Sequence, residues 1–412
     1  MAAAVRRGDR RNHPWLIVFL VVAAVWVAVT VSLQATRGGK AQPGKALPGW
    51  VNSLPGHVVS VDQENALLLS APDGSRVMFQ PSPASFDTAS GLVVSPDGRY
   101  ITDSWGDLLG TEGWRVVPNN IDSELDPSAQ LAAAPFSDGG RVLVSLSTGA
   151  TAPGASAPVA DVSLVWPSDH HVIPLGPADD AAGDPRTPGA FVTVAASPLE
   201  PGGLYERPVA DSAVEVVDVG VPARTVVTSD MLNRDLRHPS ATPVNLTVYP
   251  DPAGDKVAVV VSPVDSTQGA FPAGIQGGVV ILDRSGHLIG VGPPLNGPGR
   301  WQDTSHPVWS PQGRSLVYAP LMASGSAIAE WTTGGGFRTR PVADLATSAS
   351  CLWAPNSAAI LCPTDTGPGP GEHWLVGRTN NGRFVSVAAP GVPVAWVPSG
   401  AASQPSPAGA SS

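Results

Sequence analysis

The chain has 412 residues, of which 42% are hydrophobic and 14% charged, and its formal net charge at pH 7 is −10. Residues 46–412 are more acidic than this total suggests, because they hold 17 basic against 33 acidic side chains. Such a surface repels phosphate backbones, so the composition excludes nucleic acid as a partner. The 45 glycines and 44 prolines mostly punctuate short apolar runs, which predicts many turns between many strands.

The first predicted element is a single-pass membrane anchor over residues 15–35. Its apolar run, Trp15–Leu33, carries no charge and would span about 28 Å as a helix, enough to cross a bilayer core. Four arginines precede the run, which places the N-terminal residues 1–14 in the cytoplasm and the rest of the chain outside. A cleaved signal peptide is the alternative. Because the run is long and Val31–Ala35 is a poor cleavage site, we expect an uncleaved signal-anchor.

Composition divides the rest of the chain into three parts. Residues 36–56 are rich in Gly and Pro without apolar periodicity, which predicts a semi-flexible linker. Residues 399–412 are typical of a disordered tail. Between them, residues 57–398 contain regularly spaced apolar runs and form the predicted folded domain.

The folded domain begins with three predicted strands and continues with copies of one turn phrase. The strands are 57–61, 66–70 and 76–80. One full copy contains Ser95, Pro96, Asp97 and Gly98, and weaker copies lie at 136–141, 196–203 and 249–256, of which 196–203 is the weakest. The last three copies are built on Trp309, Pro311 and Gly313, on Trp353 and Pro355, and on Trp396 and Pro398.

The phrase describes a strand that ends in a large residue, a tight turn opened by Pro, and a second apolar strand. The three tryptophans lie 44 and 43 residues apart, which is the period of a four-stranded propeller blade. Residues 392–397 have no following strand, whereas the strands of 57–80 have no opening one, so together they would form one closing blade. The sequence thus predicts an all-β fold, a β-propeller of seven four-stranded antiparallel blades. Six blades result if 196–203 is a loop, and eight are also possible.

Two copies, Trp309–Tyr318 and Ser95–Ile101, resemble the WD40-like repeat of the TolB family. The resemblance covers residues 57–398 and implies a β-propeller. It implies no single function, because similar blades occur in periplasmic translocation proteins, oligopeptidases and sensor-associated lipoproteins. The chain also lacks the separate N-terminal mixed domain of TolB and has the predicted anchor in its place.

The two cysteines, Cys351 and Cys362, flank one repeated hairpin. If Asn356 and Ser357 form a two-residue turn, residue 351 lies opposite residue 362 and both side chains emerge on one face. In an extracytoplasmic compartment this arrangement predicts a cross-strand disulfide. Two buried free thiols are the alternative.

No catalytic motif is present in the sequence. G-x-S-x-G, H-E-x-x-H, C-x-x-C, the Walker loop and G-x-G-x-x-G are all absent. We therefore expect a protein that is not an enzyme and that has no cofactor.

The polar residues that merit most attention as ligands are His170, His171, Asp179, Asp180 and Asp184, the acids being assigned to one long loop. Imidazole and carboxylate groups at one rim could bind a divalent cation or a polar ligand. Adjacent residues of a strand point to opposite faces, however, so the two histidines could not hold the same ion. Solvated loop acids are the alternative interpretation.

These patterns favour a membrane-anchored, extracytoplasmic propeller that acts as a non-catalytic protein-binding scaffold in a cell-envelope or signalling complex. Inserts at 148–158, 177–188 and 263–276 would shape its binding face. A second hypothesis is a propeller that binds, or hydrolyses, a glycan or small metabolite in its central funnel. A third is a purely structural spacer.

Overall fold

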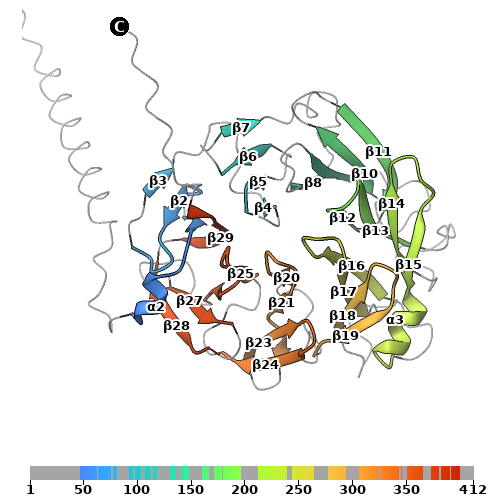
Figure 1. Ribbon diagram of the computed structural model, residues 1–412. Coiled ribbons are helices and arrows are strands. Elements are labelled where there is room, and N and C mark those ends of the chain that lie inside the picture. The colour runs from blue at the N-terminus through green and yellow to red at the C-terminus, as the bar shows by residue number, and fades with distance from the viewer. Residues whose placement is uncertain are drawn as a thin grey trace, which may run out of the picture. The chain divides into compact units, whose positions relative to one another are not determined.

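The computed structural model of the chain forms a ring of antiparallel sheets (Figure 1). The residues that it describes are 47–62, 64–75, 78–80, 92–95, 98–103, 107–111, 115–117, 130–135, 141–147, 160–166, 171–178, 180–195, 212–238, 244–263, 277–293, 306–322, 325–342, 345, 350–364, 373–379, 382–389 and 391–399. The predicted anchor and the tail beyond residue 399 lie outside them. Within these ranges, no helix has the length and apolar character needed to cross a membrane.

The described strands form seven blades, which confirms the predicted fold class and number. We number the blades from the one that contains β1. Blade 1 contains β29 (Val392–Val397), β1 (His57–Val61), β2 (Leu67–Ser70) and β3 (Met78–Gln80); blade 2 contains β4 (Val93–Val94), β5 (Tyr100–Thr102), β6 (Leu108–Gly110) and β7 (Arg115–Val117). Blade 3 contains β8 (Gln130–Pro135), β9 (Val142–Ser147), β10 (Ala160–Trp166) and β11 (His171–Ala178).

Blades 4 to 7 follow in chain order. Blade 4 contains β12 (Asp180–Gly183), β13 (Gly189–Ala195), β14 (Ser212–Asp218) and β15 (Arg224–Thr228); blade 5 contains β16 (Val244–Pro250), β17 (Lys256–Pro263), β18 (Gly278–Asp283) and β19 (Leu288–Val291). Blade 6 contains β20 (Val308–Trp309), β21 (Ser315–Tyr318), β22 (Leu321–Met322), β23 (Gly325–Thr332) and β24 (Gly336–Pro341); blade 7 contains β25 (Leu352–Trp353), β26 (Ala359–Pro363), β27 (His373–Arg378) and β28 (Phe384–Ala388). Two short helices, α2 (Gly49–Asn52) and α3 (Ser229–Asp235), complete the described elements.

Each blade is a four-stranded meander whose first strand lies near the centre of the ring and whose last strand forms the outer rim (Figure 1). In blade 6 the meander consists of β20, β21, β23 and β24, and the short β22 pairs only with the start of β23. Blade 1 joins the two ends of the chain, because β29 pairs antiparallel with β1 from Val397 opposite His57 to Val392 opposite Val61. This hydrogen-bonded junction closes the ring without leaving an open sheet edge there.

The buried side chains form seven clusters, one at each seam between neighbouring blades, among the residues described. The seam between blades 4 and 5 is filled from both sides, for example by Phe191 and Val259, and the seam between blades 6 and 7 by Ile328 and Ile360. The core is therefore a circle of sheet-on-sheet contacts, in which both faces of each blade are apolar.

Two predicted boundaries are wrong. Residues 177–188, expected to be a long acidic loop, contain the end of β11, all of β12 and a tight turn. Residues 47–56, expected to belong to the linker, pack on the propeller: Val51 of α2 is fully buried against blades 1 and 7, and Trp50 lies 5.0 Å from the Arg378 guanidinium. The composition of this segment did not indicate that it packs on the propeller, because only a few apolar side chains hold it there.

Candidate functional site

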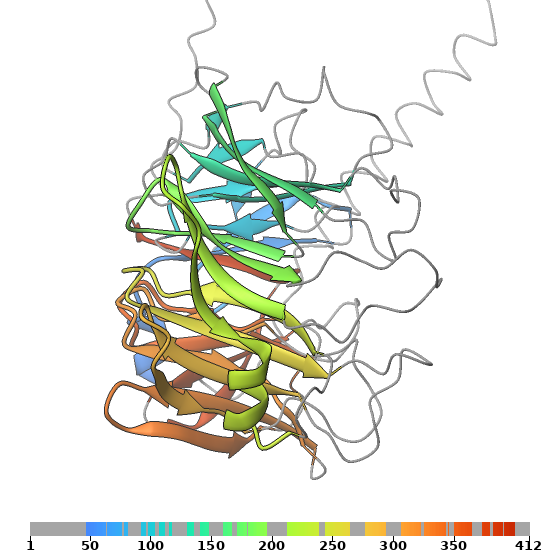
Figure 2. The same ribbon diagram turned by 90° about the vertical axis from the view of Figure 1, so that its right-hand side faces the viewer.

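The turns that join the first strand to the second, and the third to the fourth, lie on one face of the ring. They do so because the strands of a blade alternate in direction and cross the ring from face to face, as Figure 2 shows from the side. We call this face the short-turn face. Most of its turns are described, so its geometry can be followed residue by residue.

The turns after the first strands of blades 2, 5, 6 and 7 share one hydrogen-bond pattern. The carbonyl of the opening residue accepts from the N–H three residues later, at 2.7 to 2.8 Å, and the closing residue has a φ between 57 and 72°. Glycine adopts this left-handed conformation without strain, which is why the phrase contains it. The opening and closing residues are Ser95 and Gly98, Asp251 and Gly254, Ser310 and Gly313, and Ala354 and Ser357.

The opening side chain also holds the turn. Ser310 Oγ accepts from the Ser315 N–H at 3.1 Å. Asp251, which is fully buried, accepts from the N–H groups of Asp255 and Lys256 through Oδ1 and bonds Lys256 Nζ through Oδ2 at 2.7 Å. Short polar side chains favour this position because they can bond the backbone of their own turn.

Neighbouring turns touch one another across the seams. A Cβ at Gly313 would lie 2.7 Å from Asp251 Oδ2, and a Cβ at Gly254 would lie 2.6 Å from the Arg186 side chain. Gln312 bonds the Ser357 hydroxyl and the Pro355 carbonyl of the next blade. The turns of blades 4 to 7 therefore form a continuous, interlocked arc.

The three tryptophans of the repeated phrase are hydrogen-bonded through their indole N–H groups. Trp309 donates to the Tyr249 carbonyl of the preceding blade at 2.7 Å, and Trp353 donates to Val308 in the same way at 2.9 Å. Trp396, in β29, donates to the Pro55 carbonyl at 2.9 Å. All three are nearly buried, so their recurrence is explained by the seams.

The remaining motif residues lie at the turns. Pro311 and Pro355 occupy the second turn positions, and Pro398 directly follows β29. Pro96 and Asp97 lie outside the described residues, as do residues 136–140 and 196–203 of the weaker copies.

The turn after the first strand of blade 4 is formed by residues 184–188 and not by the copy expected at 196–203, which falls between β13 and β14. Asp184 opens it, is fully buried, and accepts from the Arg186 N–H at 3.0 Å and the Thr187 hydroxyl at 3.0 Å. Asp184-Pro185 corresponds to Asp251-Pro252 in the next blade. That shared dipeptide is the signal that could have located the turn.

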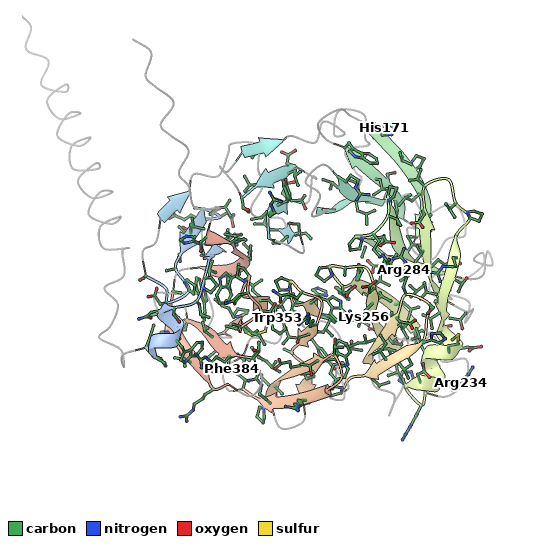
Figure 3. All side chains as sticks on the ribbon, viewed as in Figure 1. His171, Arg234, Lys256, Arg284, Trp353 and Phe384 are labelled. Carbon is green, nitrogen blue, oxygen red and sulfur yellow. A yellow bond between two sulfur atoms is a disulfide. The ribbon has the colours of Figure 1, made fainter. Side chains whose placement is uncertain are left out.

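Asp184 also binds Arg284, which comes from the turn after the third strand of blade 5. The guanidinium reaches both carboxylate oxygens, with Nη1 3.0 Å from Oδ1, and Nη1 lies 3.1 Å from the Gly254 carbonyl. The hydrogen bond that Arg284 donates to Asp184 raises the pKa of Arg284, despite desolvation. This bidentate pair joins two blades at the short-turn face, close to Lys256 in the view of Figure 3.

Arg284 also lines a shallow hollow of about 390 Å³, together with Arg224, Asp255, Asp283 and Ser285. Arg224 donates to the Arg284 carbonyl at 3.0 Å, so it is tied to the floor of the hollow. Desolvation raises the pKa of Asp283, but bonds from His287 and Ser285 lower it to about 2. Asp283 is therefore ionised at physiological pH.

The sequence-based ligand candidates that the structure describes do not converge. His171 lies exposed on the outer strand β11, with its ring 5.2 Å from that of Trp166, whereas Asp184 belongs to an inner turn. Asp180, in β12, accepts from the Val248 N–H at 3.0 Å. His170 and Asp179 lie outside the described residues. In the part of the chain that is described, no group of three metal-ligating side chains occurs.

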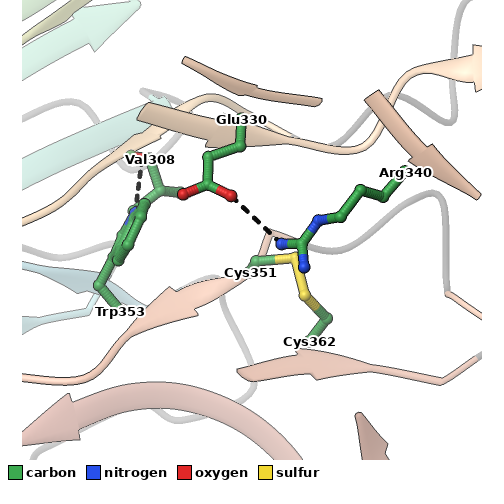
Figure 4. Close-up of a disulfide and its surroundings, with 6 residues drawn as sticks. All are labelled: Val308, Glu330, Arg340, Cys351, Trp353 and Cys362. Atoms are coloured by element: carbon green, nitrogen blue, oxygen red, sulfur yellow. Dashed lines mark hydrogen bonds and ion pairs between the residues drawn. A yellow bond between two sulfur atoms is a disulfide. The ribbon is translucent and has the colours of Figure 1, made fainter. Parts of the chain in front are cut away.

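Cys351 and Cys362 form a disulfide, with Cα atoms 4.3 Å apart (Figure 4). The pairing of Trp353 with Ile360 places the two half-cystines opposite each other, and both are fully buried between blades 6 and 7. Beside them, Arg340 bonds Glu330 at 3.2 Å. The disulfide belongs to the seam and not to a reactive surface.

No protein-family model matches the chain, and no curated protein matches it. Similar solved structures include oligogalacturonate lyase in complex with manganese, with a TM-score of 0.51 and 12% identity over 76% of this chain and 83% of the lyase. TolB from Acinetobacter baumannii has a TM-score of 0.41 and 16% identity over 70% of this chain, which spans 63% of the TolB chain. The β-propeller domain of the Trilobed protease from Pyrococcus furiosus has a TM-score of 0.48 and 8% identity, covering 82% and 94%.

At these identities the comparisons show the fold alone. The chain is a seven-bladed β-propeller of four-stranded antiparallel blades, and its structural neighbours have varied functions.

Proposed function

We propose that the chain is a non-catalytic protein-binding scaffold of the cell envelope. The observation that supports this most is the short-turn face, where interlocked turns of blades 4 to 7 hold exposed polar side chains such as Arg186, Gln312 and Arg314 on a rigid backbone. A wide face that is fixed before binding loses little conformational entropy on association, which suits recognition of another protein.

We further propose that the propeller lies outside the cytoplasmic membrane, held by an uncleaved anchor at residues 15–35. Two independent features support this location. The sequence from Trp15 to Leu33 is apolar and preceded by arginines. The disulfide between Cys351 and Cys362 is a bond that persists in oxidising compartments and is rare in the cytosol.

The test is crosslinking of the intact chain in living cells, followed by mass spectrometry of the captured proteins. The control is a variant that lacks residues 57–398 and keeps the anchor. We expect specific envelope proteins to be captured by the full chain and not by the control. Capture of the same proteins by both would contradict the scaffold function, and capture of none by the full chain would favour a glycan or metabolite ligand in the central channel instead.

A further inference from the structure

Charged residues are distributed unevenly around the propeller. Residues 46–305 hold 29 acidic against 12 basic side chains, whereas residues 306–399, which contain blades 6 and 7 and β29, hold 4 acidic against 5 basic ones. The acidic surplus of the folded domain therefore belongs to the part of the chain that forms blades 1 to 5. A charge asymmetry of this kind orients a protein in an external electric field.

The exposed cations of blades 6 and 7 include three arginines at the outer rim. Arg338 lies in β24, and Arg378 and Arg383 flank the turn between β27 and β28; all three are exposed. Arg340 joins the two blades at this place, because it donates to the carbonyls of Gly382 at 2.7 Å and Arg378 at 3.4 Å. We call Arg338, Arg378 and Arg383 the basic rim.

The one acidic residue that the structure describes within 306–399 does not neutralise the basic rim. This residue is Glu330, which is nearly buried and bonds Arg340 at 3.2 Å. Within the described part of the chain, none of the three rim arginines forms an ion pair. The basic rim therefore presents three guanidinium groups to a ligand that approaches from solvent, and planar guanidinium groups suit phosphate oxygens.

The basic rim lies where the chain leaves the propeller towards the proposed anchor. Helix α2, held by the buried Val51, lies beside β28 (Figure 1), and the Trp50 ring is 5.0 Å from the Arg378 guanidinium. Eleven residues, 36–46, separate Leu47 from the proposed anchor. Such a linker reaches about 40 Å at full extension and about 20 Å on average. The basic rim is therefore held within reach of the membrane that contains the anchor.

We infer that the basic rim docks on the anionic phospholipid headgroups of that membrane. The inference rests on the proposed membrane location and adds the orientation of the domain. Blades 6 and 7 then lie against the bilayer, and blades 3 and 4, on the other side of the ring, point away from it (Figure 1). Attraction of arginines to an anionic surface and repulsion of the acidic blades favour the same orientation. The contact uses the edge of the ring, so the short-turn face of blades 4 and 5 stays accessible to a partner protein.

The test reconstitutes the full chain through its anchor into nanodiscs of phosphatidylcholine, with or without about 30% phosphatidylglycerol. A donor fluorophore is attached at Ser386→Cys, an exposed position of β28, and an acceptor is attached to lipid headgroups. A second labelled chain carries the donor at Val221→Cys, a position 58% exposed after β14 of blade 4. The natural cysteines are buried in a disulfide and do not react with the label.

We expect phosphatidylglycerol to raise the energy transfer from position 386 and not from position 221. About 0.5 M sodium chloride should remove the rise, because it shortens the Debye length to roughly 4 Å. A variant with glutamine at all three positions of the basic rim should lower the ratio of docked to undocked domain at least tenfold. Its energy transfer in the anionic nanodiscs should then equal that in the neutral ones.

The matched control removes the same charge from blade 4 and α3, where three other arginines are exposed: Arg224, Arg234 and Arg237. Figure 3 shows Arg234 at a different side of the ring from Phe384 of β28. Replacement of these three by glutamine should leave the energy transfer from position 386 unchanged. Both triple variants should keep a Tm close to that of the natural chain, since exposed arginines contribute little to stability.

The inference is overturned if the energy transfer from position 386 is equal in the two lipids, if its rise persists at high salt, or if the control variant lowers it as much as the basic-rim variant does. A chain that does not stay in neutral nanodiscs would reject the anchor and the inference together. The scaffold function is tested separately by crosslinking the basic-rim variant in cells. Unchanged capture of the same proteins would retain the scaffold whatever the lipid result, whereas lost capture without lipid dependence would assign the basic rim to an acidic protein.

Discussion

The seams between blades 4 and 5 and between blades 6 and 7 both have an apolar core, but the first is supplemented at the short-turn face by an ion pair and the second contains a disulfide. Both seams bury an arginine beside a carboxylate. Arg284 crosses its seam to reach Asp184, but Arg340 bonds Glu330 of its own blade and crosses to blade 7 by donating to the Gly382 carbonyl at 2.7 Å.

The pKa values of the two arginines shift in opposite directions, although burial acts to lower both. The hydrogen bond to Asp184 raises the pKa of Arg284, whereas desolvation lowers the pKa of Arg340 even though Glu330 acts to raise it. A bidentate partner therefore compensates the first guanidinium more fully than a single 3.2 Å contact does the second. An arginine beside a carboxylate therefore has a raised or a lowered pKa, depending on the geometry of the contact between them.

The largest expected effect comes from breaking the charged seam. Asp184→Ala should lower the free energy of unfolding by about 3–5 kcal/mol, because Arg284 would stay partly buried without its counter-charge. Urea unfolding measures the change. Asp255→Ala, which removes the exposed partner of Arg186, is the control and should cost less than about 1 kcal/mol. Equal losses of unfolding free energy in the two variants would contradict a large contribution of the Asp184–Arg284 pair to stability.

The disulfide of the other seam should have the next largest effect. It closes a loop with a sequence separation of 11 residues, so the double variant Cys351→Ala, Cys362→Ala should lose about 2–3 kcal/mol. Thermal unfolding with and without reductant measures this. Reductant should lower the Tm of the natural chain and leave the Tm of the double variant unchanged. An unchanged Tm of the natural chain after full reduction of the disulfide would contradict the prediction.

The indole bonds should have a smaller effect that is similar at two seams. Trp353→Phe leaves the Val308 carbonyl without its indole donor and should cost about 1–2 kcal/mol. Trp309→Phe removes the equivalent bond to Tyr249 and should cost a similar amount. Urea unfolding of both variants tests whether the phrase has the same role in successive blades; a loss in one variant alone would show that it does not.

The smallest effect concerns acid stability at the charged seam. Asp283 has a folded pKa of about 2 against a usual value of 3.8, so its stabilising contribution is complete above about pH 4 and is lost as the pH falls towards 2. Asp283→Asn should therefore lose less stability than the natural chain between pH 4 and 2. Urea unfolding at pH 5, 3 and 2 measures the slope, and parallel slopes for the two proteins would contradict the low pKa.

The blade count and the site differ in how far the sequence could predict them. Seven blades follow from the turn phrase, but the phrase predicts the blade 4 turn at 196–203, whereas the turn lies at 184–188. The strand before that turn, Asp180–Gly183, contains no β-branched or aromatic residue, so local propensity indicated a loop. The strand exists because β13 and blade 5 pack against it.

The sequence by itself determined the repeating architecture, since Trp309, Trp353 and Trp396 recur at blade spacing. It also placed Cys351 opposite Cys362, because the two residues flank one short hairpin. Only the tertiary structure decided that Asp184 meets Arg284, 100 residues later, and that Arg284 lines a hollow. Contacts across a seam join turns of different blades. No local pattern encodes them, because their geometry arises when the ring closes and brings separate turns to one face.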